Sequence, residues 1–385
     1  MSGFKLIRSV LCSTVCIIFT LLSSHLMAFS DPINMPKGVT SISNDLYHLH
    51  MFVIYVCIGI GIIVFGVMFW ALIAHRKRPG YQGAKFHESL KLEILWTVIP
   101  ILILVVLAVP ATRVLIKMYD TSAADIDIKI TGYQWKWQYE YLGEDVSFFS
   151  NLATSKEAIA NEVEKNADYL LAVDQPVVVP TGKKVRFLLT ANDVIHSWWV
   201  PELGVKKDAI PGFINETWAK IDEPGIYRGQ CAELCGKDHG FMPVVVEAKS
   251  PRDFAAWLNE KKAAAMAAKA AEAKVVWDKE TLTAKGKNIY LRNCAACHMP
   301  NGAGMPPTFP ALAGSSMVLG EAKPQIDVLV NGRQGTAMQA FGNQLSDAEI
   351  ASVITYTRNA WGNEDQGEDK IVLPEQITEF KQNNN

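Results

Sequence analysis

The chain has 385 residues, enough for two or three domains, and almost half of them (49%) are hydrophobic. A mean hydropathy of +0.11 is high for a wholly soluble protein, so membrane-spanning segments are expected. The formal net charge of −2 argues against nucleic acid as a partner.

The first residues have the pattern of a bacterial secretory signal. Lys5 and Arg8 precede an apolar run at residues 10–27, and we expect residues 1–28 to be a signal peptide. The alternative is a retained first membrane helix, but serines interrupt the run and make it short for a span.

Residues 29–112 contain two apolar stretches that are long enough to cross a bilayer. We expect a transmembrane hairpin with spans at about residues 49–74 and 92–110, the second ending at Pro110. The short connecting loop is rich in Arg and Lys, which places it in the cytoplasm. Everything after the hairpin then lies in the periplasm, outside the bacterial inner membrane.

Residues 113–248 consist of short β-rich runs separated by turn residues, which predicts a small antiparallel sandwich. The polar segment at residues 150–168 is helical in composition and is expected to be an exposed insertion. Four aromatic residues alternate with polar ones and are expected on one packed sheet face: Trp135, Trp137, Tyr139 and Tyr141.

The stretch C-A-E-L-C-G-K-D-H-G-F-M, residues 231–242, gathers two Cys, one His and one Met on one loop. Thiolate, imidazole and thioether are the ligands that favour copper over hard cations. Two thiolates on a tight loop can bridge two metal ions, with one imidazole completing each. The second imidazole must come from elsewhere, and the candidate is His196 in N-D-V-I-H-S-W-W-V, at the expected end of a strand.

Two other interpretations of this loop stay open at this point. Cys231 and Cys235 can form a disulfide in an exported protein, and Cys and His at short spacing are also the usual ligands of zinc. Met242 argues against zinc, and a disulfide would leave His239 and Met242 without a role.

A second motif follows a change of composition. Residues 249–280 are rich in Ala, Lys and Glu, which predicts a helical linker. Within residues 281–362, C-A-A-C-H is the signature of covalent haem attachment, in which Cys294 and Cys297 bond the haem and His298 binds the iron. The polar tail at residues 363–385 is expected to be disordered.

The loop at residues 231–242, together with N-D-V-I-H-S-W and G-V-K-K-D-A-I-P-G, resembles subunit II of haem–copper cytochrome c oxidases. The resemblance extends from about the first membrane segment to Lys249. The resemblance implies a multidomain chain with a transmembrane α-helical hairpin and an all-β cupredoxin-like barrel that holds a binuclear copper A (CuA) centre. It implies these ligands: His196, Cys231, Glu233 through its backbone carbonyl, Cys235, His239 and Met242. The Glu233 side chain would also bind Mg²⁺ at the contact with subunit I.

The segment after the linker resembles an all-α class I cytochrome c, with helices expected at residues 285–292 and 347–361. This resemblance implies that Met338 is the distal ligand of the haem iron. Met305 and Met317 are the fallback ligands.

The family resemblance assigns two further roles. Trp135 would be the indole through which electrons enter from cytochrome c. Glu93 would form the entrance of a proton channel into subunit I, with Glu88 as the weaker alternative.

Together these features imply the electron-transfer subunit of a proton-translocating cytochrome c oxidase. Its partners would be subunits I and III and a soluble or membrane-bound cytochrome c, with O₂ reduced in subunit I. One alternative is the CuA electron-entry subunit of a nitric oxide reductase, which would not need Glu93. The other is a membrane-anchored copper-delivery protein, which would not need a haem.

Overall fold

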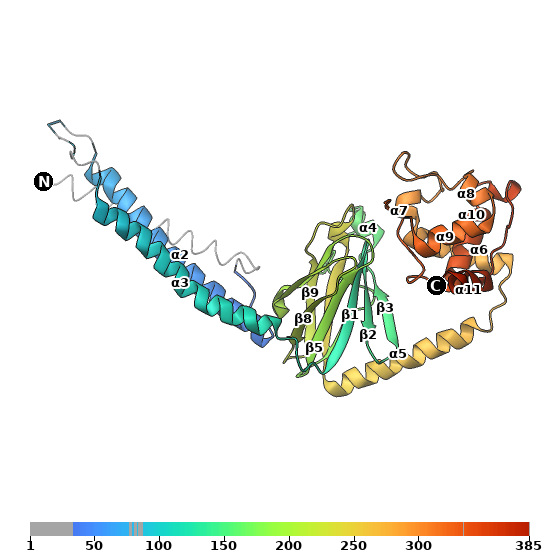
Figure 1. Ribbon diagram of the computed structural model, residues 1–385, viewed down its shortest axis with the longest axis horizontal. Helices are drawn as coiled ribbons and strands as arrows, with labels where there is room; N and C mark the ends of the chain where they lie inside the picture. Colours follow the sequence, from blue (N-terminus) through green and yellow to red (C-terminus); the bar gives the residue numbers. More distant parts are fainter. Residues whose placement is uncertain (1–33, 77–78, 81–82, 84–87, 334, 385) are drawn as a thin grey trace. The chain divides into compact units, whose positions relative to one another are not determined.

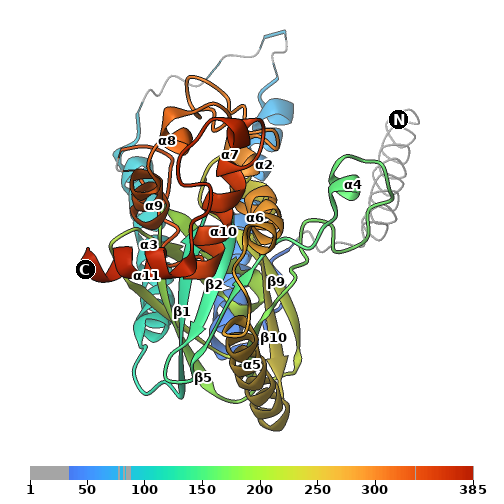
Figure 2. The same ribbon diagram turned by 90° about the vertical axis from the view of Figure 1, so that its right-hand side faces the viewer.

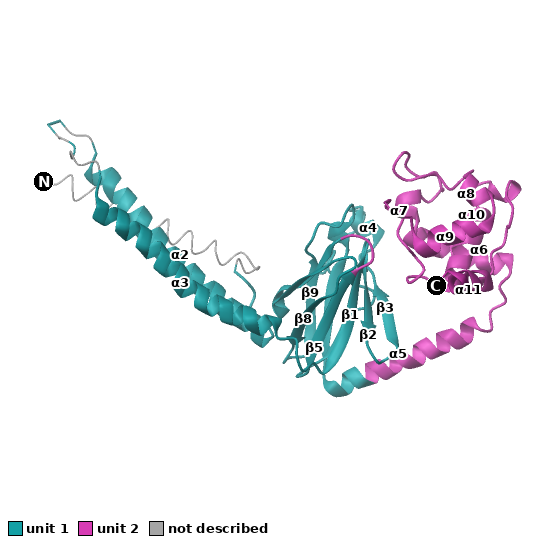
Figure 3. Cartoon of the chain, in the orientation of Figure 1, with its two compact units in different colours: residues 1–190, 195–255 teal, residues 191–194, 256–385 magenta. Residues whose placement is uncertain are grey.

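The structure is a computed structural model, and the predicted signal peptide lies outside its described residues, which are 34–76, 79–80, 83, 88–333 and 335–384. The chain forms two compact units, which Figure 3 colours separately. Unit 1 comprises residues 1–190 and 195–255, and unit 2 comprises residues 191–194 and 256–385.

Unit 1 begins with two long apolar helices, α2 (Ser41–Ala74) and α3 (Leu90–Tyr119), which lie side by side (Figure 1). Both are long and apolar enough to cross a membrane. The prediction that Pro110 ends the second span is wrong, because Pro110 lies inside α3. A proline costs a helix one backbone hydrogen bond, and apolar membrane helices tolerate this where neighbouring groups satisfy the freed carbonyl.

The start of α2 is joined to the β-domain by hydrogen bonds. Thr40 caps α2, and its hydroxyl also donates to the carbonyl of Leu203 over 2.9 Å. The Val39 N–H donates to the Glu202 carbonyl over 3.0 Å. Leu203 and Glu202 belong to the short helix η1 (Pro201–Leu203), so the residues that start α2 bind the β-domain through two backbone carbonyls of η1.

The end of α3 is fixed in the same region. The Lys117 ammonium lies 2.6 Å from the Asp45 carboxylate of α2, and the Lys117 carbonyl accepts a hydrogen bond from the Trp218 indole over 3.2 Å. Both apolar helices are therefore tied to the β-domain.

Two five-stranded sheets form the β-domain, with strand orders β3-β2-β1-β5-β8 and β4-β10-β9-β6-β7. The expected sandwich is confirmed. Strands β4 and β10 pair in parallel, and antiparallel pairing joins β1 with β2, β2 with β3, β5 with β8, β6 with β7, β6 with β9, and β9 with β10. The strands are β1 (Ile126–Tyr133), β2 (Lys136–Tyr141), β3 (Val146–Ser150), β4 (Val177–Pro180), β5 (Lys184–Ala191), β6 (His196–Val200), β7 (Val205–Ala209), β8 (Asn215–Lys220), β9 (Gly225–Cys231) and β10 (Pro243–Lys249).

The aromatic residues of β2 share one face, as expected from their alternation. Trp137, Tyr139 and Tyr141 are buried in the core. Trp135 does not belong to this face. The pairing of Tyr133 with Lys136 leaves Trp135 in the turn between β1 and β2, so this part of the prediction is wrong.

The segment between β3 and β4 contains only one short helix, α4 (Lys156–Ile159), despite its helical composition. Figure 2 shows it as a loop that extends away from the sheets. The base of the loop is closed by a bridge between Leu152 and Val173. The Arg228 guanidinium of β9 ties the loop to the sheet through the Asp168 carboxylate over 2.8 Å.

A long helix, α5 (Pro251–Glu272), leads from unit 1 into unit 2, where the sequence predicts a helical linker. The helices that follow α5 lie in unit 2. They are α6 (Lys279–Asn293), α7 (Ala295–His298), α8 (Ser316–Leu319), α9 (Ala322–Asn331), α10 (Asp347–Arg358), η3 (Asn363–Asp365) and α11 (Pro374–Asn383). The helices expected at residues 285–292 and 347–361 correspond to α6, which begins earlier, and α10, which ends earlier.

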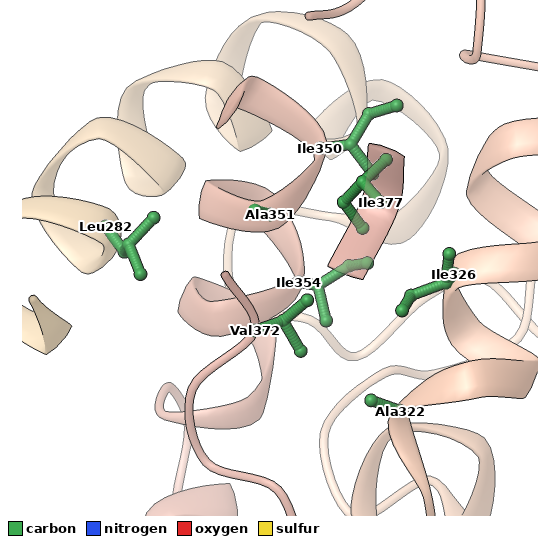
Figure 4. Close-up of a cluster of buried hydrophobic side chains, with 8 residues drawn as sticks. All are labelled: Leu282, Ala322, Ile326, Ile350, Ala351, Ile354, Val372 and Ile377. Atoms are coloured by element: carbon green, nitrogen blue, oxygen red, sulfur yellow. The ribbon is translucent and has the colours of Figure 1, made fainter. Parts of the chain in front are cut away.

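The C-terminal tail is ordered, so the prediction of disorder is wrong. Val372 and Ile377 are fully buried in the core of unit 2 (Figure 4). Phe380, three positions after Ile377, packs against the same core. Apolar residues are few in this segment, but those of α11 lie on one helix face, and this spacing outweighs the polar composition.

Candidate metal centre

The predicted ligands come from two neighbouring strands and the loop that follows one of them. Cys231 is the last residue of β9, and Met242 directly precedes β10. The sequence predicted that a strand ends at His196, whereas His196 is the first residue of β6. β6 pairs with β9 such that Trp198 lies opposite Cys231, which brings His196 to the same end of the sheet.

The two thiols lie close together without a bond between them. The Sγ atoms of Cys231 and Cys235 are 3.8 Å apart, whereas a disulfide requires about 2.05 Å. The geometry therefore argues against the disulfide interpretation. Nδ1 of His196 lies 3.9 Å from Sγ of Cys231, and the Glu233 carbonyl lies 3.4 Å from the same sulfur.

Cys235 has its own pair of neighbours. Nδ1 of His239 and Sδ of Met242 each lie 3.5 Å from its Sγ atom. His239 belongs to the short helix η2 (His239–Phe241), which turns its ring back toward the thiols. One imidazole thus lies beside each sulfur, His196 from β6 beside Cys231 and His239 from the loop beside Cys235.

The donor set fits two copper ions better than one zinc ion. The side chains of His196, Cys231, Cys235 and Met242 are buried, and a soft thioether stands among them, which suits copper. Structural zinc takes four ligands, typically Cys and His, whereas six donor atoms converge here.

The surroundings of Cys231 favour the thiolate form of its side chain. Its pKa is lowered to about 3, first by the hydrogen bond with the Cys235 thiol and then by those from His196 and the backbone of Ser197, which together outweigh burial. The thiolate is the form of cysteine that ligates metals.

The turn between β1 and β2 supports the loop from outside. The Cys235 carbonyl accepts hydrogen bonds from Nε2 of Gln134 over 2.8 Å and from Nε1 of Trp135 over 3.3 Å. Gly236 permits this approach. It has a φ of +119°, and a Cβ there would lie 3.0 Å from Nε2 of Gln134. Gln134 was not among the predicted site residues, and its only signal in the sequence is its position beside Trp135.

The buried aromatic face packs against His196. The rings of Trp137 and His196 meet edge to face with centroids 5.8 Å apart, and the Trp137 indole donates to the Met242 carbonyl over 3.4 Å. A Cβ at Gly132 would lie 2.8 Å from Cδ2 of His196, so only glycine leaves room for the imidazole. These contacts fix the ring in one orientation.

The other residues predicted in unit 1 lie apart from the ligands or point away from them. The Glu233 side chain is exposed, although its carbonyl belongs to the site. Glu93 lies half-buried in the first turn of α3, at the opposite end of that helix from the β-domain contacts.

Unit 2 contains the predicted haem attachment residues on one turn. Cys294 caps α7, and Cys297 and His298 lie within that helix. Nδ1 of His298 donates to the Pro310 carbonyl over 2.9 Å, which leaves Nε2 for an iron ion. Cys294 and Cys297 are not joined as a disulfide. This arrangement fits a covalently attached haem.

The candidate distal ligands differ in exposure. Met338 is half-buried in the loop between α9 and α10. Met305 and Met317 are exposed, which makes them poorer candidates. The role of Met338 as a ligand stays a prediction.

Three parts of the chain match known families. Residues 126–249 match "Cytochrome C oxidase subunit II, periplasmic domain", and residues 28–114 match "Cytochrome C oxidase subunit II, transmembrane domain". Residues 281–356 match "Cytochrome C oxidase, cbb3-type, subunit III".

Individual relatives carry related names. "Probable cytochrome c oxidase subunit 2" of Rickettsia felis is 40% identical over 258 residues, covering 66% of this chain and 80% of the relative. "Cytochrome c oxidase subunit 2" of Cereibacter sphaeroides is 36% identical over 236 residues, covering 58% and 78%. A crystal structure of the periplasmic domain of subunit II of cytochrome oxidase from Bradyrhizobium japonicum is 42% identical and covers 37% of this chain and 96% of that one, with a TM-score of 0.33.

Proposed function

The chain belongs to the cytochrome c oxidase subunit II family, and we propose that it passes electrons from cytochrome c to the haem of subunit I, where O₂ is reduced. It combines a membrane anchor, a periplasmic domain of that family and a cytochrome c domain, and it is part of a haem–copper oxidase complex with subunit I. We further propose that the complex lies in the bacterial inner membrane, contains subunit III and pumps protons.

The observation that supports this proposal most is the cluster of six donor atoms supplied by His196 and by the loop at residues 231–242. Cys231 and Cys235 would bridge two copper ions, with His196 and His239 completing one each. Met242 and the Glu233 carbonyl would be the weaker ligands. A binuclear copper centre supplies one-electron transfer when bound.

The protein scaffold suits such a centre because its ligands are held by rigid elements. His196 and Cys231 lie on paired strands, and the loop from Cys231 to Met242 is held by hydrogen bonds to the carbonyls of Cys235 and Met242. Ligands fixed in this way move little between redox states, so little reorganisation opposes the transfer of an electron.

The cytochrome c domain would supply a second one-electron site. Cys294 and Cys297 would attach a haem covalently, and His298 and Met338 would bind its iron. Ligation by His and Met raises the reduction potential of a haem. The external donor would be a soluble or membrane-bound cytochrome c.

Three further residues receive proposed roles. The partly exposed Trp135 contacts the Cys235 carbonyl and would admit electrons to the copper loop. The exposed Glu233 carboxylate would bind Mg²⁺ at the contact with subunit I. Glu93, an ionisable residue at the end of a membrane helix, would form the entrance of a proton channel.

The decisive experiment is purification of the complex from membranes, followed by metal analysis, optical spectra and electron paramagnetic resonance. We expect two copper ions in this chain, a hyperfine pattern from one electron shared between them, the bands of haem c, and O₂ uptake with reduced cytochrome c. Zinc or a cystine in the 231–242 loop would refute the proposal. Consumption of nitric oxide in place of O₂ would favour the reductase alternative.

A further inference from the structure

The loop that carries Met338 is folded back on the helix before it. We call residues 332–344 the methionine loop, of which residue 334 is outside the described part. The Arg333 N–H donates to the Met338 carbonyl over 2.8 Å, and the Gly342 N–H donates to the Val330 carbonyl at the end of α9 over 3.1 Å. Gly332 has a φ of +72°, and a Cβ there would lie 2.7 Å from the backbone nitrogen of Ala340. The loop is therefore tightly packed at its base.

The last helix of the chain, α11, reaches the end of this loop. Nζ of Lys381 donates to the Gly342 carbonyl over 2.9 Å and to the Asp347 carboxylate over 2.7 Å. The Thr378 hydroxyl donates to the other oxygen of Asp347 over 2.6 Å. Because Asp347 begins α10, the Lys381 side chain connects the methionine loop to the helix that follows it, and Thr378 adds a second contact between α11 and that helix.

Apolar contacts join α11 to both flanks of the loop. Ile377 is fully buried in the core that Figure 4 shows, beside Ile326 of α9 and Ile350 and Ile354 of α10. Partly buried residues pack around the same core: Val330 before the loop, Leu345 after it and Phe380 of α11. Helix α11 therefore packs against both α9 and α10, the two helices that the methionine loop connects.

Buried polar contacts fix the segment that leads to α11. The fully buried Arg358 guanidinium donates to the carbonyls of Glu368 and Asp369, each over 2.8 Å. The Thr355 hydroxyl and the backbone of Val372 exchange two hydrogen bonds of 3.0 and 3.2 Å. A buried donor costs free energy unless it is paired, so the segment satisfies groups that α10 cannot satisfy alone.

We propose that residues 366–384, the C-terminal strap, position the methionine loop and so set how firmly Met338 binds the haem iron. This inference rests on the proposed role of Met338 as distal ligand. Lys381 is a positioning residue, because it acts through the carbonyl of Gly342. The strap lies beyond residues 281–356, which match the cytochrome family.

Imidazole provides a test, because it competes with a methionine thioether for ferric iron. In the purified complex, its binding is followed at the absorption bands of haem c. We expect Lys381→Met to tighten imidazole binding about tenfold, which corresponds to about 1.4 kcal/mol, and to weaken the absorption band of methionine-ligated ferric haem. Lys381→Arg should restore both. Lys370→Met is the matched control, because it removes a lysine from the same strap whose Nζ donates to the Glu364 carbonyl, outside the methionine loop.

Met338→Ala separates the two levels of the proposal. If it leaves imidazole affinity and the methionine band unchanged, Met338 is not the ligand and the inference fails with it. If Met338→Ala changes both but Lys381→Met changes neither, the ligand stands and the positioning role of the strap is refuted. Equal effects of Lys381→Met and Lys370→Met would also refute it, because they would reflect charge alone.

Discussion

The indole Nε1 of Trp135 donates a hydrogen bond to the backbone carbonyl of Cys235 over 3.3 Å. Trp135 is partly exposed in the turn between β1 and β2, and Cys235 is buried with its thiol beside that of Cys231. One side chain thus reaches from the surface of the β-domain to the loop that carries both sulfurs.

Replacement of this indole should slow electron entry without loss of copper. Trp135→Phe keeps an aromatic ring but removes the N–H, while Gln134 still holds the Cys235 carbonyl. We expect the rate with reduced cytochrome c to fall at least about tenfold, or about 1.4 kcal/mol of barrier, measured by rapid mixing. Trp199→Phe, at another partly exposed indole, is the control. An unchanged rate, or equal slowing in both variants, would contradict the role of Trp135.

Removal of one bridging sulfur should empty the whole centre, because each thiolate would serve both ions. We expect Cys235→Ser to lose both copper ions per chain and the shared-electron signal, while the haem c bands remain. Metal analysis and electron paramagnetic resonance measure this. Cys57→Ser, on the exposed surface of α2, should retain both ions. Retention of one copper in Cys235→Ser would argue for independent sites.

Proton uptake should depend on Glu93. With Glu93→Gln, we expect O₂ turnover to fall at least about tenfold, which corresponds to about 1.4 kcal/mol of barrier, with copper and haem contents unchanged. Glu88→Gln is the control and should turn over normally. The assignment of Glu93 fails if its variant keeps full turnover, and passes to Glu88 if only that variant is slow.

The C-terminal strap should contribute measurably to the stability of the cytochrome domain. Ile377→Ala removes a fully buried side chain, and such truncations cost about 2–5 kcal/mol. Denaturant unfolding followed at the haem c bands should show this loss. Ile371→Ala, which is exposed, should leave the midpoint unchanged. Equal midpoints for both variants would mean that α11 is not packed as the structure has it.

The free energy of unfolding of the β-domain should depend on pH through Glu202, which lies in η1 at the contact with the start of α2. Burial raises the pKa of its carboxyl group above the ordinary range. The folded state then disfavours the charged form, so stability is lost as pH rises from the unfolded pKa through the folded one. Glu202→Gln should therefore stabilise the β-domain at pH near 7, by less than about 1 kcal/mol, and have no such advantage below about pH 4. Glu223→Gln, at an exposed position, is the control. A constant difference between wild type and Glu202→Gln at all pH values would exclude a titrating carboxyl.

The metal loop was readable from sequence because its donors are local. Cys231, Cys235, His239 and Met242 lie within twelve consecutive positions, so any compact loop brings them near one another. His196 required one long-range assumption, the pairing of β6 with β9. Gln134 could not be found in this way. In an alternating strand pattern it resembles an ordinary surface residue, and its contact with Cys235 exists only because the strand turns there.

Two local rules failed in this chain. Proline usually ends a helix, but Pro110 lies within α3, whose apolar length favours continued helix. A polar tail usually stays disordered, yet Arg358 and the apolar core of unit 2 order residues 366–384. For the tail, the missing information was a set of partners far away in sequence.

The hydrogen bond between Thr40 and Leu203 has a consequence for the response to lipid thickness. It joins the first turn of α2 to η1, which directly follows the strand that begins with His196, and Trp218 secures the end of α3 to the same domain. A joint fixed at both helices leaves no hinge to absorb a mismatch between the hairpin and the bilayer. The helices must then tilt as a whole, and the β-domain, with the loop at residues 231–242, changes its orientation to the membrane together with them.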